Sequence, residues 1–179
     1  MSKRLVASSL PNFVGIFESG SRPPSDLPIS VLSIPGNEPI VLSRYGDDVW
    51  DFSPYIKVVN RSRGASQIYW NKRNLCKPLI ESCKAATLAY WKFGAYKSKK
   101  RPEAGTFIPF ARNLLNFSQW LQDRGISTFN QIDQDTTAAY AAWIRHPDRD
   151  IKTSSKELLL AVLETLHESH RVSWRPQLL

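Results

Sequence analysis

Hydrophobic residues recur at helical spacing through much of the second half of the chain. Between residues 106 and 124 they share one face of a helix, formed by Phe107, Phe110, Ala111, Leu114, Phe117, Ser118 and Leu121. This spacing predicts an amphipathic helix with a wide apolar stripe. Gly125 follows Arg124, and a glycine after a basic last turn is a typical helix stop. We therefore expect the helix to end just before Gly125.

A second helix is predicted after a short connection at residues 126–132. Asp133 is a residue type that caps helix amino termini. The expected buried face of this helix consists of Ala139, Tyr140, Trp143 and Ile144. Pro147 should end it, because the residue before a proline is disfavoured in the helical conformation.

A third helix is predicted at residues 151–169, where the apolar stripe consists of Leu158, Leu159, Val162, Leu163 and Leu166. Ser154 and Glu157 have the spacing of a capping box, in which the serine accepts from a backbone amide and the glutamate reaches back. Free amides at a helix amino end favour a phosphate. Thr153, Ser154 and Lys156 are therefore candidate phosphate contacts.

The first half of the chain contains one more strongly periodic segment, a long helix at about residues 77–93. Its stripe consists of Leu79, Ile80, Cys83, Ala86, Thr87 and Tyr90, and the lysines at 77, 84 and 92 are expected to lie off it. Pro78 fits only in the first turn, and Gly94 is a stop signal. Cys76 and Cys83 would be about 10 Å apart along this helix, too far for a disulfide, so free thiols are expected.

Before this helix, prolines and glycines interrupt the chain repeatedly. Residues 29–34 and 40–42 have the composition of short strands, with a turn at residues 35–37. Both a small hairpin and an irregular segment wrapped on the rest fit this pattern. Trp50 and Trp70 are more typical of packing residues than of platforms for base stacking, because large aromatic side chains are seldom left exposed.

These elements predict a mainly α fold in which a helical-bundle domain follows a small α+β or irregular amino-terminal segment. The segment covers residues 1–101, with short strands, the helix at about 77–93 and a basic linker at 94–102. The helical domain covers residues 103–179. The chain has no run of about 20 apolar residues and no secretory signal pattern. The expectation is thus a cytoplasmic protein without a membrane partner.

Positive charge is concentrated in the middle third of the chain. Residues 52–102 contain twelve lysines and arginines and one acid, whereas the segments before and after have net charges of −2 and −1. Such segregation is typical of a nucleic-acid-binding surface. The candidate DNA-binding residues are Arg61, Arg63, Lys72, Arg73, Lys97, Lys99, Lys100, Arg101, Arg112, Thr153, Ser154 and Lys156.

The order of features in residues 107–170 points to a family. A helix with Phe117 and Trp120-Leu121 leads into Asp123-Arg124-Gly125, and Ile132-Asp133 opens a helix with Tyr140 and Trp143-Ile144. This resembles the core-binding (SAM-like) domain of tyrosine recombinases, the phage integrase family. The resemblance implies a region that clamps duplex DNA at a recombination site for DNA integration or recombination. It also implies a nucleoid-associated protein, bacterial or phage-encoded, with other recombinase protomers as further partners and no small-molecule substrate or cofactor.

The catalytic set of that family includes two arginines, a histidine-rich His-x-x-Arg box and a tyrosine nucleophile in a separate domain. No tyrosine follows Tyr140, and we interpret the box as absent too. The resemblance therefore implies a region that binds DNA without cutting it, from a longer strand-transfer enzyme. His167 and His170 have no further partner for a metal, so no metal site is expected. A non-catalytic nucleic-acid-binding regulator and a protein-interaction module with a basic face remain the alternatives.

Overall fold

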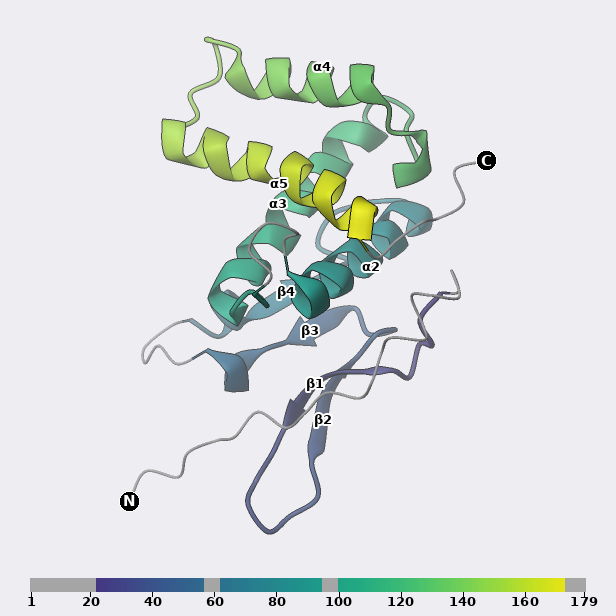
Figure 1. The fold of residues 1–179 in the computed structure, drawn as a ribbon, viewed down its shortest axis with the longest axis vertical. Helices are drawn as coiled ribbons and strands as arrows, with labels where there is room; N and C mark the ends of the chain where they lie inside the picture. Colours follow the sequence, from purple (N-terminus) through teal and green to yellow (C-terminus); the bar gives the residue numbers. More distant parts are fainter. Residues whose placement is uncertain (1–21, 57–61, 95–99, 173–179) are drawn as a thin grey trace.

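The computed structural model describes residues 22–56, 62–94 and 100–172 (Figure 1). In this part, four helices and two small antiparallel sheets are present, so the expected mainly α class with a small β portion is confirmed. The helices are α2 (Lys77–Phe93), α3 (Ala104–Gln122), α4 (Gln134–Arg145) and α5 (Thr153–Val172). The strands are β1 (Pro28–Leu32), β2 (Ile40–Arg44), β3 (Val49–Asp51) and β4 (Gln67–Tyr69). Figure 1 shows α4 and α5 at one end, the β1–β2 hairpin at the other, and α2, β3 and β4 between them, with α3 running from α5 toward β4.

Strands β1 and β2 form the hairpin that was one of the two sequence interpretations. They pair antiparallel, with Leu32 opposite Ile40 and Val31 opposite Val41. The turn between them includes Gly36, whose φ of 82° lies in the region that favours glycine. Strands β3 and β4 form a second antiparallel pair, with Trp50 opposite Ile68. Trp50 and Ile68 are both fully buried.

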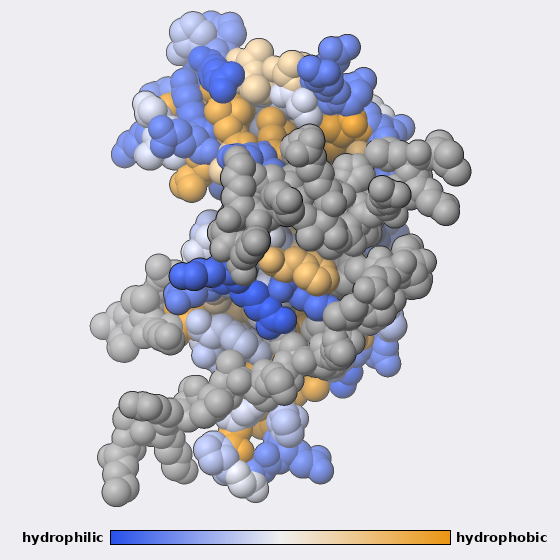
Figure 2. All heavy atoms as spheres, in the orientation of Figure 1, coloured by the Kyte–Doolittle hydropathy of each residue, from blue (hydrophilic) through white to orange (hydrophobic). Residues whose placement is uncertain are grey.

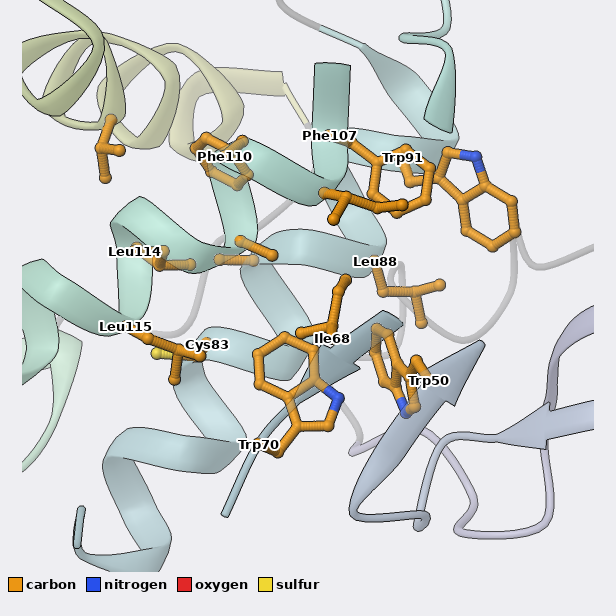
Figure 3. Close-up of a cluster of buried hydrophobic side chains, with 14 of the residues drawn as sticks. Trp50, Ile68, Trp70, Cys83, Leu88, Trp91, Phe107, Phe110, Leu114 and Leu115 are labelled. Carbon is orange, nitrogen blue, oxygen red and sulfur yellow. The ribbon is translucent and has the colours of Figure 1, made fainter. Parts of the chain in front are cut away.

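Aromatic side chains from the region of strands β3 and β4 meet those of helices α2 and α3 in the core (Figure 3). Trp50 and Trp70 are fully buried, as expected, and their ring centroids lie 4.8 Å apart. Phe107 of α3 lies 4.6 Å from Phe52, which follows β3, and 5.0 Å from Trp91 of α2. The same buried cluster continues to Tyr140, Ile144 and Val162 in α4 and α5. One hydrophobic core therefore extends across the predicted boundary at residues 101–103.

The predicted helix ends agree closely with the structure. Helix α2 has the expected bounds, and Gly94 follows it with a φ of 73°. A side chain at Gly94 would collide with the Lys100 carbonyl, so glycine is required there. Gly125 has a φ of 78° after α3. Asp133 caps α4 by accepting a 2.7 Å hydrogen bond from the Thr136 amide. Cys76 and Cys83 are free.

Lys84 differs from its expected place off the apolar stripe of α2. It is only 3% exposed, and its Nζ donates to the carbonyl oxygens of Tyr45 at 3.1 Å and Gly46 at 3.3 Å. The reason is that α2 is covered on two sides, by α3 and by the turn after β2. Burial accordingly lowers the pKa of Lys84, although the nearby carboxylate of Glu81 opposes this effect.

Two expectations for α4 and α5 were wrong. Ala139 is exposed, because α4 buries a narrower face centred on Tyr140 and Ile144. Helix α5 begins at Thr153, and the Lys156 amide donates to the Lys152 carbonyl. Ser154 therefore lies inside the first turn of α5 and does not cap it.

Across the described ranges, no helix is long and apolar enough to span a membrane.

Replacing Phe107 with alanine should lower the free energy of unfolding by about 3–5 kcal/mol, because it removes a fully buried ring that packs against Phe52 and Trp91. Chemical denaturation followed by circular dichroism measures this change. The matched control is Leu158→Ala, since Leu158 is 58% exposed and its truncation should cost no more than about 0.5 kcal/mol. The shared core also predicts a single cooperative transition, and two separate transitions would contradict it.

Candidate nucleic-acid interface

The polar side of α3 is where segments from the rest of the chain are attached. Arg112 donates from Nη2 to the carbonyl oxygens of Gly64 at 2.5 Å and Gln67 at 2.9 Å. These bonds hold the start of β4 against α3. The sequence pattern predicted Arg112 as a phosphate contact, and the structure gives its guanidinium group an internal role that the pattern did not indicate.

Two further side chains of α3 hold the segment between β4 and α2. The Gln122 amide donates to the Asn74 carbonyl at 2.8 Å and accepts from the Cys76 amide at 2.6 Å. One turn and a half earlier, the Asn116 side-chain oxygen accepts a hydrogen bond from Arg73. Arg73 is therefore held against the flank of α3, and the neighbouring Lys72 is exposed.

The amino-terminal half of α5 lies on α3 as well. The Asn113 side chain donates to the Leu158 carbonyl at 3.4 Å. Lys156 and Leu159 are three residues apart in α5 and so lie on the same side of that helix. Lys156 is half-buried, whereas Thr153 and Ser154 are exposed in the first turn. The structure thus places these three candidates together at one end of α5.

A pocket of about 240 Å³ opens where these elements meet. Its walls come from the segment before α2, from α3 and α4, and from the start of α5. The lining residues are Arg73, Asn116, Gln119, Trp120, Asp123, Tyr140, Trp143, Arg149 and Leu159. We name it the Arg73–Arg149 pocket. Of the predicted candidate residues, Arg73 lines the pocket, and α5 contributes Leu159.

Arg149 is a functional candidate that the sequence interpretation missed. Its guanidinium carbon lies 3.2 Å from the centre of the Trp143 ring, a close cation–π contact. His146 and Arg149 do have His-x-x-Arg spacing, so the statement that no such box is present was wrong. In the structure His146 lies 3.6 Å from Asp148, and Arg149 faces the aromatic ring. The sequence signal that could have identified Arg149 is its position shortly after a helix that carries a tryptophan.

Two further described candidates, Lys100 and Arg101, lie at the opposite end of α2. Lys100 and Arg101 are exposed, and Arg101 donates from Nε to the Lys92 carbonyl at 2.9 Å. Helix α2 has 17 residues, which corresponds to a length of about 25 Å. Lys100 and Arg101 are therefore not part of the Arg73–Arg149 pocket. The candidates Arg61, Lys97 and Lys99, and the side chain of Arg63, lie outside the described residues.

Two polar atoms in the walls of the pocket are buried without a partner. They are the Tyr140 hydroxyl and the Trp120 indole nitrogen, each with less than 1 Å² exposed. Burial raises the pKa of Tyr140 to about 12, although the positive charge of Arg149 opposes this effect. A desolvated donor without an acceptor is unfavourable. The indole nitrogens of Trp50 and Trp70 in the core are buried in the same way.

No protein-family model, curated protein or solved structure matches this chain. The functional argument consequently depends on the residues and their arrangement. In the described part of the chain, no three histidine, cysteine, aspartate or glutamate side chains lie close enough together to hold a metal ion.

Arg112→Ala should lower the free energy of unfolding by about 1–3 kcal/mol, because two carbonyl oxygens lose a charged donor. Thermal or urea denaturation measures the change. Lys72→Ala, which truncates an exposed cation in the nearby segment, is the control and should change stability by no more than about 0.5 kcal/mol. Equal effects of the two substitutions would contradict the internal role of Arg112.

Tyr140→Phe should leave stability unchanged or slightly raised at neutral pH, because the hydroxyl has no protein partner. In the parent protein, the folded state retains the Tyr140 proton between pH 10 and about 12, whereas the unfolded state loses it. The stability linked to this proton is thus fully present below pH 10 and is lost as the pH rises toward 12.

Between pH 10 and about 12, the free energy of unfolding of the variant should therefore fall by about 1–2 kcal/mol less than that of the parent. Urea denaturation at a series of pH values measures the difference. Some alkaline loss should remain in the variant, because burial also raises the pKa of Tyr45 and raises that of Cys83 to about 12. If the free energy of unfolding depended on pH identically in the two proteins, the raised pKa of Tyr140 would be contradicted.

Proposed function

We propose that this chain is the DNA-binding region of a site-specific recombinase of the tyrosine recombinase type, and that it holds duplex DNA mainly by its phosphates. The observation that carries the proposal is the charge segregation: twelve basic residues and one acid lie between residues 52 and 102. A merely solvated surface would mix both signs along its length. The order of helices in residues 107–170, which resembles the core-binding domain of that family, adds to this argument.

The arrangement of the described basic residues supports a contact with an extended polyanion. One group consists of Arg73 and Arg149, which line the Arg73–Arg149 pocket, with Lys72 next to Arg73 in the sequence and Lys156 one helical turn before the lining residue Leu159. The second group consists of Lys100 and Arg101, at the other end of α2. The separation of about 25 Å corresponds to roughly seven base pairs of B-DNA, at about 3.4 Å for each pair. A duplex lying along α2 would reach both groups.

The outer face of α4 is a poor candidate for the same contact. Ala138, Ala139 and Ala142 are exposed there. Figure 2 shows weakly hydrophobic surface at the top of the molecule, where α4 lies in Figure 1. A face of small apolar side chains offers phosphate no donor. The proposal therefore puts DNA on the side of the Arg73–Arg149 pocket and leaves the outer face of α4 free of it.

The proposed role is binding without strand cleavage. Lysine and arginine contacts to phosphate fix the position of a protein on a duplex but carry little sequence information. The transition state of phosphoryl transfer needs preorganised cations and a nucleophile. No tyrosine follows Tyr140 in this sequence, and we propose that a separate part of the recombinase supplies the chemistry.

Binding to a random-sequence duplex of about two helical turns should weaken steeply with salt, with a slope near −0.9 for each phosphate neutralised. Fluorescence anisotropy at a series of salt concentrations measures it. Lys72→Gln should reduce the slope by about 0.9. Arg145→Gln is the control, because Arg145 is exposed at the end of α4 and should leave the slope unchanged.

Two results would overturn the proposal: binding that does not depend on salt, and an absence of binding to generic duplex DNA. Preference for an acidic protein over DNA, in a competition between the two, would instead favour an interaction module. Circular dichroism should show that both variants keep the parent fold, since Lys72 and Arg145 are exposed.

A further inference from the structure

The segment between β4 and α2 presents one exposed cation on a backbone that is attached at both ends. We name residues 71–76 the Lys72 segment, after the exposed Lys72. Just before it, the fully buried Trp70 donates from its amide to the Asp48 carbonyl at 2.8 Å. Near its other end, Leu75 is buried in the hydrophobic core. The reach of Lys72 is therefore set by a short stretch of chain between two fixed points.

Gln122, the half-buried last residue of α3, binds two backbone groups of the Lys72 segment. Its side-chain nitrogen donates to the Asn74 carbonyl at 2.8 Å, and its side-chain oxygen accepts from the Cys76 amide at 2.6 Å. We name this pair of hydrogen bonds the Gln122 bracket. The segment belongs to no helix or strand, and a backbone of that kind loses conformational entropy when it is ordered. The Gln122 bracket therefore fixes a conformation that regular secondary structure does not.

A second side chain of α3 fixes the residue next to Lys72. The Asn116 side-chain oxygen accepts a hydrogen bond from Arg73. Helix α3 thus holds the Lys72 segment at Arg73, Asn74 and Cys76, whereas the ammonium group of Lys72 is left on the surface. A binding surface that is ordered in advance binds more tightly, because less conformational freedom is lost on binding. This arrangement is what a preorganised phosphate contact requires.

We propose that Gln122 is a positioning residue for DNA binding: it fixes the Lys72 segment in the conformation from which Lys72 contacts a phosphate of the duplex. This inference rests on the proposed function, because it concerns the same contact with DNA. Gln122 acts through the backbone and does not itself touch the phosphate. A lysine is a point charge on a flexible stem, so the backbone that carries it decides where the charge can reach. Loss of the Gln122 bracket therefore weakens binding although no cation is removed.

Fluorescence anisotropy of the full chain with a duplex of about two helical turns tests the proposal, with Gln122→Met as the variant. Methionine is unbranched like glutamine but can make neither hydrogen bond of the bracket. Duplex binding should weaken about 5- to 30-fold, because about one backbone residue must be ordered again on binding. Ile144→Val is the control, since it truncates a fully buried side chain of α4, lowers stability and should bind DNA as the parent does. Equal affinities of Gln122→Met and the parent would overturn the proposal.

A double-mutant cycle separates positioning from a merely structural role. In the parent, Lys72→Gln should reduce the salt slope by about 0.9, the share of one phosphate. In the Gln122→Met background, the same substitution should reduce the slope by less than about half of that, because Lys72 is no longer held at the phosphate. Lys100→Gln, at the opposite end of α2, is the matched control and should change the slope equally in both backgrounds. A full effect of Lys72→Gln in the Gln122→Met background would overturn the proposal.

The outcomes distinguish this inference from the proposed function. If the parent binds duplex DNA with the expected salt dependence and Gln122→Met binds equally well, the positioning role is overturned and the proposed function stands. If the parent does not bind duplex DNA, both are overturned. Hydrogen–deuterium exchange of the proteins without DNA reports on the bracket itself: the amides of Leu75 and Cys76 should exchange faster in Gln122→Met than in the parent. Unchanged exchange at these amides would overturn the role of Gln122 in fixing the Lys72 segment.

Discussion

The contacts made by both sides of α3 are the interaction on which the rest of the structure depends. On the apolar side, Phe107 packs against Phe52 and Trp91 and so joins the sheet region to the helices. On the polar side, Arg112, Asn116 and Gln122 bond to the chain between residues 64 and 76. One helix therefore positions the small sheets, the start of α2 and the amino end of α5. The pocket walls from Arg73, α3 and α5 follow from this arrangement, and Tyr140 of α4 packs separately on Trp120 of α3.

Much of the fold was predictable from local signals. The bounds of α2 follow from an apolar stripe between Pro78 and Gly94, and the start of α4 follows from Asp133. These signals act within a few residues, so they can be read from the sequence. The burial of Lys84 could not be read in this way, because it depends on carbonyl groups of Tyr45 and Gly46 from a distant turn. Periodicity finds one apolar face and gives no sign that a second side of the helix is covered.

The candidate site was predictable only in part, for the same reason. The sequence showed where positive charge is concentrated, and of the predicted residues Arg73 lines the pocket, whereas Lys72 and Lys156 do not. Charge density could not show that Arg112 is bonded to backbone carbonyl groups. It also gave no weight to Arg149, an arginine in a segment of mixed charge, whose position depends on Trp143. Arg112 and Arg73 are held by contacts with Gly64 and Asn116, which lie more than 40 residues away in the sequence, and no local pattern reports such contacts.

The proposed function and the pocket share one surface, and its position can be tested without any substitution. Hydrogen–deuterium exchange of the full chain, with and without a duplex of about two helical turns, is the most direct measurement. The account predicts that DNA slows exchange at residues 72–76 and in the first turns of α5, and leaves α4 unchanged. Slower exchange confined to α4, or no change anywhere at a DNA concentration well above the dissociation constant, would contradict it.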